Sequence, residues 1–542
     1  MFTGNGNGNG NGNGNGHKYY LRPDVQVEPL INQWPAWPHL VPPATAAMNI
    51  AYLHLRVMKS FIMAPQLHAS TLKDKAMTGG LFMNLPPERV DEVKELFGRT
   101  VVEQAHMIQF AEAIKALNEM LLNEAKGHSM ESLYEKIPPL LKGYVELVYD
   151  LNNNPSARFI EGLLYHSRYY DPSRQGLNLS LINSDDRHFP YATPRFKDEG
   201  SVQIKIPFEN EGIDKLAKMK RTPYSFGEIA EALGLAEDDR ATFQNFLTTE
   251  PPRTTPRYTG DQVRIRYLNH ACLLIETKDV SILIDPLLAY EYERTMPCYS
   301  YADLPEVINY ALVTHGHPDH LVLESLLQLR HKIETLIVPR SAGGTLEDSS
   351  LRLLLKNIGF KQVIEIDEME TIPIPGGQLV GLPFLGEHAD LDIRSKMAHL
   401  VQLDGKSILC ATDSRNVSPE LYERVHDIVG DIDVLFLGME CDGAPLSWMY
   451  GQLCSRKIAR DMDQSRRLSG SNFKLGMKIV DQLHCGQAYV YAMGQEPWLN
   501  YLTSIHYTDE SQPIVESNKL VEECRRRNIT SERLFGSKEI FV

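Results

Sequence analysis

The sequence predicts an α/β protein with an α-rich (α+β) N-terminal domain followed by a strand-rich α/β domain. The length of 542 residues exceeds that of one compact domain, so two domains are expected. Long apolar segments that favour helices dominate the first half, whereas short β-branched or apolar runs typical of strands dominate the second. The proline-rich segment 251–256 between the two halves is typical of a linker.

The N-terminal domain is expected over residues 17–250. It follows a Gly-Asn repeat that cannot form a hydrophobic core, so residues 1–16 are expected to be a disordered tail. Gly98 is a candidate joint between two long helices. Residues 152–210 are rich in Tyr, Asn, Arg and Pro and are expected to form loops with short strands. Helical segments are predicted at 44–63, 88–126, 130–151 and 224–247.

The second domain is expected over residues 260–510, after a linker at 251–259. Helical segments fall between several of its strands, and side chains that bind metals stand at strand ends. Residues 511–542 are interpreted as a C-terminal extension. Strands are predicted at 263–267, 272–276, 280–284, 310–313, 335–338, 362–366, 379–384, 399–403, 407–411, 433–437 and 488–492.

The composition predicts a cytoplasmic protein without nucleic-acid or membrane partners. A net charge of −15 disfavours binding to nucleic acid, which requires a basic surface. No run reaches the ~18 apolar residues of a membrane helix, and the N-terminus lacks the pattern of a signal peptide. The seven cysteines are scattered without a CxxC pair, which indicates reduced thiols.

The segment Thr314–His320, with the sequence THGHPDH, is the strongest indication of function. It lies between a predicted strand and a helix-like run, and its His and Asp side chains are ligands of divalent metals. Alternation along an extended backbone points His315 and His317 the same way. The turn then brings Asp319 and His320 toward a second position. The spacing favours two adjacent metals over one metal, and over a polar loop that is rich in His by chance.

One loop cannot complete a binuclear site, so further ligands are expected downstream. Two later strands end in suitable residues. The strand at 379–384 leads into Glu387 and His388, and the strand at 407–411 leads into Asp413. A carboxylate at Asp413 could bridge two cations and offset part of their repulsion.

These motifs together resemble the metallo-β-lactamase fold over about residues 260–510. The resemblance implies a four-layer αβ/βα sandwich with a binuclear site at one edge of two sheets. It also implies that His315 and His317 hold one metal, that Asp319 and His320 hold the other, and that Asp413 bridges them. The matching segments are the hairpin 267–277, the strand 282–286, the His315–His320 motif and Asp413.

The sequence departs from the hydrolases of this fold at two positions. Those enzymes usually supply an imidazole as third ligand of the first metal, whereas here Glu387 and His388 are adjacent and the spacing alone does not choose between them. They also usually place a last His at the end of the final strand, and 488–496 contains none. His484 or Glu440 are candidates for that position.

A site with one more carboxylate and one fewer imidazole favours oxidised iron over zinc. Together with the long helical N-terminal region, this ligand set resembles the diiron β-hydroxylases of nonribosomal peptide biosynthesis, of the chloramphenicol-pathway type. The resemblance covers nearly the whole chain after the tail. It implies that Glu387 is the third ligand, and it makes Glu387 and Asp413 the candidate catalytic residues.

The resemblance further implies an O₂-dependent diiron monooxygenase that hydroxylates Cβ of an aminoacyl group. The substrate would be tethered as a thioester to the phosphopantetheine of a nonribosomal peptide synthetase carrier (thiolation) domain. Two iron ions (Fe²⁺/Fe³⁺) and O₂ are expected, with electrons from an external electron-transfer protein, because the sequence has no nucleotide-binding fingerprint. The N-terminal region is expected to form a homodimer and part of a substrate tunnel.

Two other functions stay open on the sequence alone. In a binuclear hydrolase acting on thioesters, His388 would be the ligand instead of Glu387. In a scaffold subunit, the metal site would be vestigial. For several further side chains, the sequence does not decide between a structural and a functional role. They are His270, Arg415, Tyr491, Trp498 and the cluster 165–170.

Overall fold

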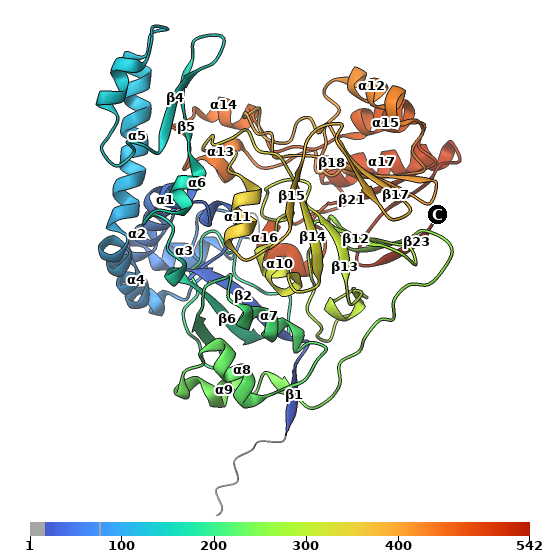
Figure 1. Cartoon of the computed structure of the whole chain (residues 1–542), viewed down its shortest axis with the longest axis horizontal. Coiled ribbons are helices and arrows are strands. Elements are labelled where there is room, and N and C mark those ends of the chain that lie inside the picture. Colours follow the sequence, from blue (N-terminus) through green and yellow to red (C-terminus); the bar gives the residue numbers. More distant parts are fainter. Residues whose placement is uncertain (1–16, 75–76, 78) are drawn as a thin grey trace, which may run out of the picture.

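The computed structural model describes residues 17–74, 77 and 79–542. The tail predicted at 1–16 therefore lies outside the described residues. Two facing β-sheets form the C-terminal region, and the N-terminal helices and small sheets pack beside them (Figure 1). Among the described residues, no helix combines the length and apolar character needed to cross a bilayer.

Three small sheets and two long helices organise the N-terminal region. Four strands pair antiparallel in the order β3-β2-β6-β7, three in the order β8-β1-β9, and β4 with β5. The helix α5 and the β4–β5 hairpin rise together at the upper left of Figure 1. The bounds are β1 (Lys18–Leu21), β2 (Val25–Ile31), β3 (Trp34–Pro35), α1 (Pro43–Asn49), α2 (Leu55–Met63), α3 (Pro65–Thr71), α4 (Val90–Glu103), α5 (Ala105–Glu124), β4 (Val145–Tyr149), β5 (Pro155–Phe159), α6 (Glu161–Tyr165), β6 (Gln175–Leu181), β7 (Val202–Lys205), α7 (Glu211–Lys218), β8 (Tyr224–Ser225), α8 (Phe226–Leu233), α9 (Arg240–Gln244) and β9 (Leu247–Thr248).

Two predictions for this region are wrong. Residues 130–151 do not form a helix, because their apolar run Val145–Tyr149 pairs as β4 with β5, after a short 3₁₀ turn at Glu131–Lys136. The joint between the long helices lies at Gln104, whose backbone is not helical (φ −111°, ψ 22°). Gly98 instead lies inside α4, where it has open space around it.

The first large sheet has the order β15-β14-β13-β12-β11-β10-β23. Its four strands from β12 to β15 run parallel, and the remaining pairs are antiparallel. The helices α10 (Leu323–Leu329) and α11 (Leu351–Asn357) connect its parallel strands. Its strands are β10 (Arg264–Asn269), β11 (Cys272–Glu276), β12 (Ser281–Ile284), β13 (Ile308–Leu312), β14 (Ile333–Pro339), β15 (Val363–Ile366) and β23 (Lys538–Phe541).

The second large sheet has the order β16-β17-β18-β19-β20-β21-β22 and repeats the same design. It is antiparallel from β16 to β19 and parallel from β19 to β22. Its strands are β16 (Thr371–Ile374), β17 (Gly377–Leu382), β18 (Ala398–Leu403), β19 (Lys406–Cys410), β20 (Val434–Gly438), β21 (Gln487–Tyr491) and β22 (Thr530–Arg533).

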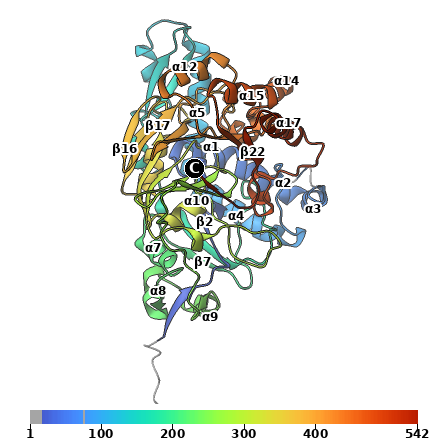
Figure 2. The same ribbon diagram turned by 90° about the vertical axis from the view of Figure 1, so that its right-hand side faces the viewer.

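The side chains bury three apolar layers and make the predicted four-layer αβ/βα arrangement. One layer lies between the two sheets and includes Ile275, Val401 and Phe436. The helices α12 (Pro419–Val429), α15 (Phe473–Gln482) and α17 (Gln512–Arg526) cover the outer face of the second sheet. Of these, α15 and α17 lie side by side in Figure 2. The N-terminal region, with α10 and α11, covers the outer face of the first sheet.

Every predicted strand of the second domain is present, whereas β16, β22 and β23 were missed. These three strands are four residues long and partly exposed, so their sequences carry no clear alternation. Two of them lie within the segment 511–542, which extends both sheets, since β23 pairs with β10 and β22 with β21. The predicted domain boundaries themselves stay a prediction.

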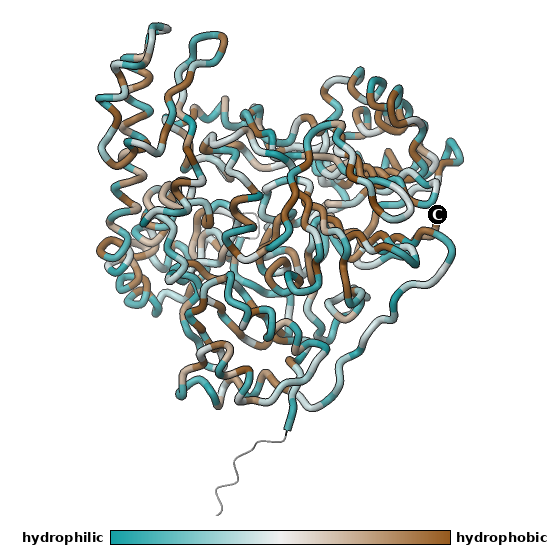
Figure 3. The backbone as a smooth tube through the Cα atoms, viewed as in Figure 1, coloured by the Kyte–Doolittle hydropathy of each residue, from teal (hydrophilic) through white to brown (hydrophobic). Residues whose placement is uncertain are grey.

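The segment predicted as a linker forms no helix or strand. The same is true of the whole stretch 249–263. It runs along the outside of the molecule at the right of Figure 3, where its colour is mostly white to teal. Its few contacts include the pairing of Arg253 with Asp303, which ties it to the region before β13.

Buried charges join the N-terminal region to α10. Glu28, on β2, accepts a hydrogen bond from Arg195 Nε at 2.8 Å and lies 3.4 Å from Arg187 Nη2. Arg187 also reaches Glu324 of α10 at 2.7 Å. Burial alone would raise the pKa of Glu28, but the Arg195 and Arg187 guanidinium groups outweigh it and hold that pKa below its usual range.

We expect Glu28→Ala to lower the free energy of unfolding by about 3–5 kcal/mol, because it leaves the largely buried Arg195 guanidinium without its carboxylate and leaves Arg187 with Glu324 alone. Chemical denaturation measures the change. The matched control is Asp91→Ala, which removes the exposed carboxylate beside Lys94 and should have little effect. Equal effects of the two substitutions would contradict the prediction.

Candidate metal centre

The predicted metal-binding residues lie on three loops that meet at one edge of the two sheets. The loop Thr314–His320 follows β13, Glu387 and His388 follow β17, and Asp413 follows β19. Each loop continues from the end of a buried strand, so the sheets fix where the side chains begin. The structure therefore brings together residues that are up to about a hundred positions apart in the chain.

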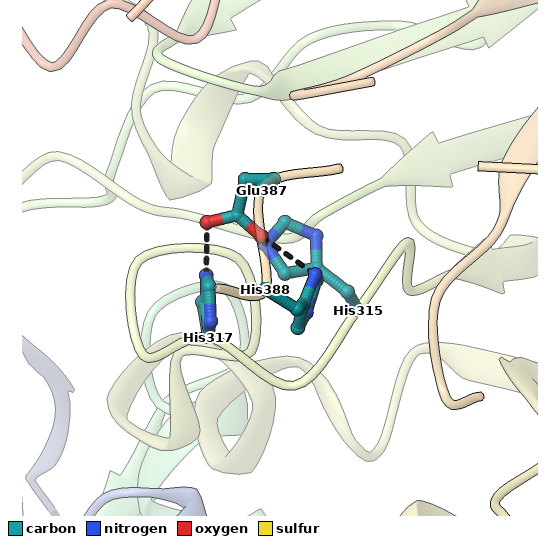
Figure 4. Close-up of side chains that lie close together, drawn as sticks. All are labelled: His315, His317, Glu387 and His388. Carbon is teal, nitrogen blue, oxygen red and sulfur yellow. Dashed lines mark ion pairs between the residues drawn. The ribbon is translucent and has the colours of Figure 1, made fainter. Parts of the chain in front are cut away.

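The first cluster gathers around the Glu387 carboxylate (Figure 4). His317 Nδ1 lies 2.8 Å from Glu387 Oε1, and His388 Nδ1 lies 2.8 Å from Oε2. His315 Nε2 is 3.9 Å from the same Oε2. The ligand atoms of all four residues lie within 4.8 Å of one another, so one cation could contact them. The distances alone do not choose between Glu387 and His388 as the third ligand.

The second cluster lies beside the first and contains Asp319, His320 and Asp413. His320 Nε2 is 3.0 Å from Asp413 Oδ2 and 3.9 Å from Asp319 Oδ2. The Oδ2 atom of Asp413 is also 3.8 Å from His315 Nε2, so this carboxylate touches both clusters. A carboxylate in this position could be shared by two adjacent cations.

His270, whose role the sequence left undecided, belongs to the second cluster. Its Nε2 lies 3.2 Å from Asp319 Oδ2, and its ring is 5.0 Å from that of His320. Its Nδ1 accepts a hydrogen bond from the Gly494 backbone N–H at 3.1 Å. The imidazole is therefore held at Nδ1 and presents Nε2 to the centre.

The unpaired atoms in the centre fit two cations. Buried polar atoms in proteins nearly always have hydrogen-bond partners, because an unpaired one costs about 1–3 kcal/mol. Six atoms here are buried without a well-aligned partner among the described residues, and all six are possible metal ligands. They are His270 Nε2, His315 Nε2, His320 Nε2, Glu387 Oε2, His388 Nδ1 and Asp413 Oδ1.

Asp285 and Tyr450 orient two of the imidazoles. Asp285 Oδ2 accepts a hydrogen bond from His320 Nδ1 at 2.8 Å, and Asp285 is itself held by the backbone N–H and hydroxyl of Thr314. The Tyr450 hydroxyl lies 2.9 Å from His317 Nε2. These contacts leave His320 Nε2 and His317 Nδ1 facing the centre, as supporting partners do in metal sites.

We expect Asp285→Asn to weaken binding of the metal beside His320 by about 10–100-fold, because the imidazole loses the charged acceptor that orients it. Titrating the iron-loaded protein with a chelator measures the affinity. The matched control is Asp239→Asn, which changes a buried carboxylate paired with Lys197 in the N-terminal region. Unchanged iron retention in Asp285→Asn would overturn the assigned role.

Burial and neighbouring charges set the protonation of the centre. Burial lowers the pKa of His315, and the His320 and His317 imidazoles lower it further. For Glu387, burial acts to raise the pKa, but His317 and His388 hold it well below its usual range. A neutral imidazole beside an ionised carboxylate is the form that binds a cation.

For His320 the balance is different, and its pKa is raised. Burial acts to lower that pKa, but the Asp413 and Asp319 carboxylates outweigh it. Protons and metal ions compete for the same nitrogen. Metal binding at this position should therefore weaken as the pH falls.

The backbone around the centre adopts unusual conformations. Glu387 has φ 64°, Thr412 has φ 45°, His270 has φ 45° and Asp285 has φ 41°. Non-glycine residues in this left-handed region cost about 1–3 kcal/mol each and cluster at functional sites. The surrounding sheets hold these loops in place, so part of the folding free energy positions the ligands.

The two candidates for the missing last ligand lie elsewhere or are otherwise occupied. His484 contacts Asp431 at 2.9 Å on the surface, next to His426, and is not part of the centre. Glu440 accepts a hydrogen bond from the Tyr507 hydroxyl at 2.8 Å. Burial and the nearby Asp442 and Asp413 raise its pKa to about 7.

The other side chains with undecided roles are structural in their contacts. Tyr165 and Tyr169, of the cluster 165–170, pack in the N-terminal core. Trp498 is buried beside Arg294. The Tyr491 hydroxyl accepts the Thr412 backbone N–H at 3.1 Å and so supports the loop that carries Asp413. Sequence reasoning missed Tyr450, since no motif surrounds it.

Comparison with known proteins gives full-length matches. Residues 20–251 match the N-terminal domain of diiron non-heme β-hydroxylases, and 281–448 match a β-lactamase superfamily domain. A relative from Streptomyces venezuelae is 35% identical over 525 residues. It is the 3-hydroxylase of the 4-amino-L-phenylalanyl group carried on the CmlP peptidyl carrier protein. This alignment covers 95% of this chain and 98% of the relative. The crystal structure of CmlA, a diiron β-hydroxylase from the same species, superposes with a TM-score of 0.91 at 34% identity, covering 97% and 99% of the two chains.

The sequence similarity to a curated metal-dependent hydrolase is short. A metal-dependent hydrolase of Desulforamulus reducens is 39% identical over only 59 residues, which is 11% of this chain and 23% of the relative. The hydrolase alternative is therefore not favoured, and neither is a scaffold without activity. The chain belongs to the diiron non-heme β-hydroxylases, a family of enzymes with two iron ions, as the motifs and the ligand set predicted.

Proposed function

We propose that this enzyme uses O₂ to hydroxylate Cβ of an aminoacyl group held as a thioester on a nonribosomal peptide synthetase carrier domain. The observation that carries the proposal is the full-length similarity to an enzyme that hydroxylates a carrier-bound aminoacyl group. The paired clusters of His and carboxylate side chains support it, since they suit two hard cations.

We propose that His315, His317 and Glu387 hold one iron, that Asp319 and His320 hold the other, and that Asp413 bridges the two. The contacts of 3.0 and 3.8 Å from Asp413 to the two clusters support the bridging role. Two ferrous ions bound there would supply electrons and open positions for activating O₂ and removing hydrogen from Cβ.

The protein's own groups prepare that chemistry in three ways. Three carboxylates in the proposed set, Glu387, Asp319 and Asp413, offset three of the four positive charges of two ferrous ions. Burial of the imidazoles excludes bulk water, which strengthens each electrostatic contact. His388, whose Nδ1 contacts Glu387, is assigned to positioning that carboxylate instead of binding the metal.

The same proposal includes the partners. We infer a carrier domain that delivers the substrate, a separate electron-transfer protein and a homodimer, in the cytoplasm. The absence of a nucleotide-binding fingerprint in the sequence supports an external electron donor.

The test supplies the iron-loaded enzyme with a reductant, a carrier loaded with 4-amino-L-phenylalanine and isotopically labelled dioxygen. The expected product, detected by mass spectrometry, keeps the thioester and gains one labelled hydroxyl oxygen. Cleavage of the thioester without any need for O₂ would instead indicate a hydrolase and overturn the proposal.

A further inference from the structure

A small cavity of about 20 Å³ adjoins the candidate metal centre on the side of the N-terminal region. One wall contains His317 and His388 of the first cluster. The rest of the lining includes His39 of the N-terminal region, Tyr450, and Glu347 and Asp348 from the segment before α11. The space suffices for one small polar group, since a water molecule needs about 10–15 Å³ by the same measure.

The cavity wall is acidic and contains no Lys or Arg. Asp348 is fully engaged, since it accepts hydrogen bonds from the backbone N–H groups of Arg394 and Ser395 at 3.0 and 3.2 Å and from the Ser395 hydroxyl. Lys396 interacts with Asp348 and Glu387 but is not part of the wall. Asp348 therefore has a structural role, and Glu347 is the carboxylate of the wall that is left to bind a ligand.

Glu347 is that available carboxylate. No Lys, Arg or His nitrogen within the described part of the chain lies within 4.0 Å of it, and the hydrogen bond that acts to lower its pKa comes from its own backbone N–H and not from another residue. Burial and the nearby Asp348 and Asp392 carboxylates raise its pKa. A carboxylate in such surroundings gains from a cationic partner, because the partner offsets both the burial and the repulsion.

A second unpaired group faces the same space. The Nδ1 atom of His39 is buried and has no hydrogen-bond partner among the residues that the structure describes. In the neutral tautomer that carries its proton on Nε2, this Nδ1 can accept a hydrogen bond. A carboxylate and a neutral imidazole together suit a ligand that donates several hydrogen bonds and carries a positive charge.

We propose that Glu347, with His39, binds the free α-ammonium group of the aminoacyl substrate and makes the enzyme select aminoacyl carriers over N-acylated peptidyl carriers. This inference rests on the proposed function, because the ammonium lies one carbon from the Cβ that is hydroxylated. An acylated nitrogen would have no charge and would keep a single N–H donor, so it would gain little from the Glu347 carboxylate.

The inference also places the reaction in a sequence of steps. An amino group that must be free during hydroxylation has not yet been joined to another acyl group. Loading of the amino acid onto the carrier must therefore supply the substrate, and an amide-forming step must consume the β-hydroxylated product afterwards.

The test compares two stable substrate analogues on the full-length enzyme loaded with iron. One is 4-amino-L-phenylalanine joined by an amide to pantetheine, and the other is its Nα-acetyl derivative. Isothermal titration calorimetry without O₂ measures the Kd of each. We expect the analogue with the free amine to bind at least about tenfold more tightly than the acetyl analogue, because a hydrogen bond between charged groups contributes that much affinity.

Three variants isolate Glu347. Glu347→Gln should bring the ratio of the two Kd values to about one and leave the Kd of the acetyl analogue unchanged, which also shows that the variant is folded. Glu347→Asp keeps the charge and should retain part of the preference. The matched control Glu365→Gln changes a half-buried carboxylate of β15 outside the cavity and should keep the full preference.

The outcomes separate this inference from the proposed function. A wild-type enzyme that hydroxylates the carrier substrate but binds both analogues equally would overturn the ammonium site alone. The same holds if Glu347→Gln keeps the full preference. An enzyme that prefers the free amine but does not hydroxylate any carrier-bound aminoacyl group would overturn the proposed function and leave the site standing.

Discussion

Replacing Asp413 with alanine is expected to weaken iron binding at both positions of the centre. Its Oδ2 atom lies 3.0 Å from His320 Nε2 and 3.8 Å from His315 Nε2, so no other carboxylate touches both clusters in the same way among the described residues. Removing it takes away a shared ligand and the negative charge between two divalent ions, which then repel each other. We expect iron content to fall from about two to below about one ion per chain.

Activity should fall with the metal. Loss of a group that only supports a ligand costs about 10–100-fold, so loss of a shared ligand should cost more than about a hundredfold in hydroxylation rate. The matched control is Asp404→Asn, in the turn at the opposite end of β19, where φ is 49° and Asn is well tolerated. Two retained irons in Asp413→Ala would contradict the bridging assignment.

Most strands of the sandwich were predictable, because each of these is a short, strongly apolar run bounded by turn residues. The candidate ligands were predictable for a related reason. His315, His317, Asp319 and His320 share one local motif, and Asp413 directly follows a strand. Both kinds of signal are local, and the burial of parallel strands makes them strong.

The remaining features depend on contacts between distant segments. His39 and Tyr450 lie more than 400 residues apart in the sequence, yet their rings are 5.8 Å apart beside His317. The turn at Gln104 and the strand β4 depend on their neighbours in the N-terminal region, and propensity alone favoured other structures. Only tertiary packing decides such positions.

This packing gives the N-terminal region a part in the site. It supplies His39 to the cavity beside the metals, and Tyr191 lies close enough to Asp319 for that carboxylate to raise the tyrosine pKa further, after burial. The metal ligands come from the sandwich, but part of the wall around them does not. Differences in substrate between relatives can therefore arise in the N-terminal region without any change of the metal ligands.

The choice between Glu387 and His388 separates an iron oxygenase from a hydrolase. We expect Glu387→Ala to lose about one of the two irons and the associated near-ultraviolet absorption, because the carboxylate contacts both His317 and His388 and lies 3.9 Å from His315. His388→Ala should keep both irons and lose about 10–100-fold in hydroxylation rate, as expected for a residue that positions a ligand.

The two side chains are adjacent and both nearly fully buried, so each substitution is the control for the other. Damage to the loop would affect both variants alike, whereas a ligand role affects one. Metal analysis after growth with iron and zinc both present distinguishes the cases. If His388→Ala loses the metal and Glu387→Ala retains it, the site has the three-imidazole character of a hydrolase, and the preference for iron over zinc loses its physical basis.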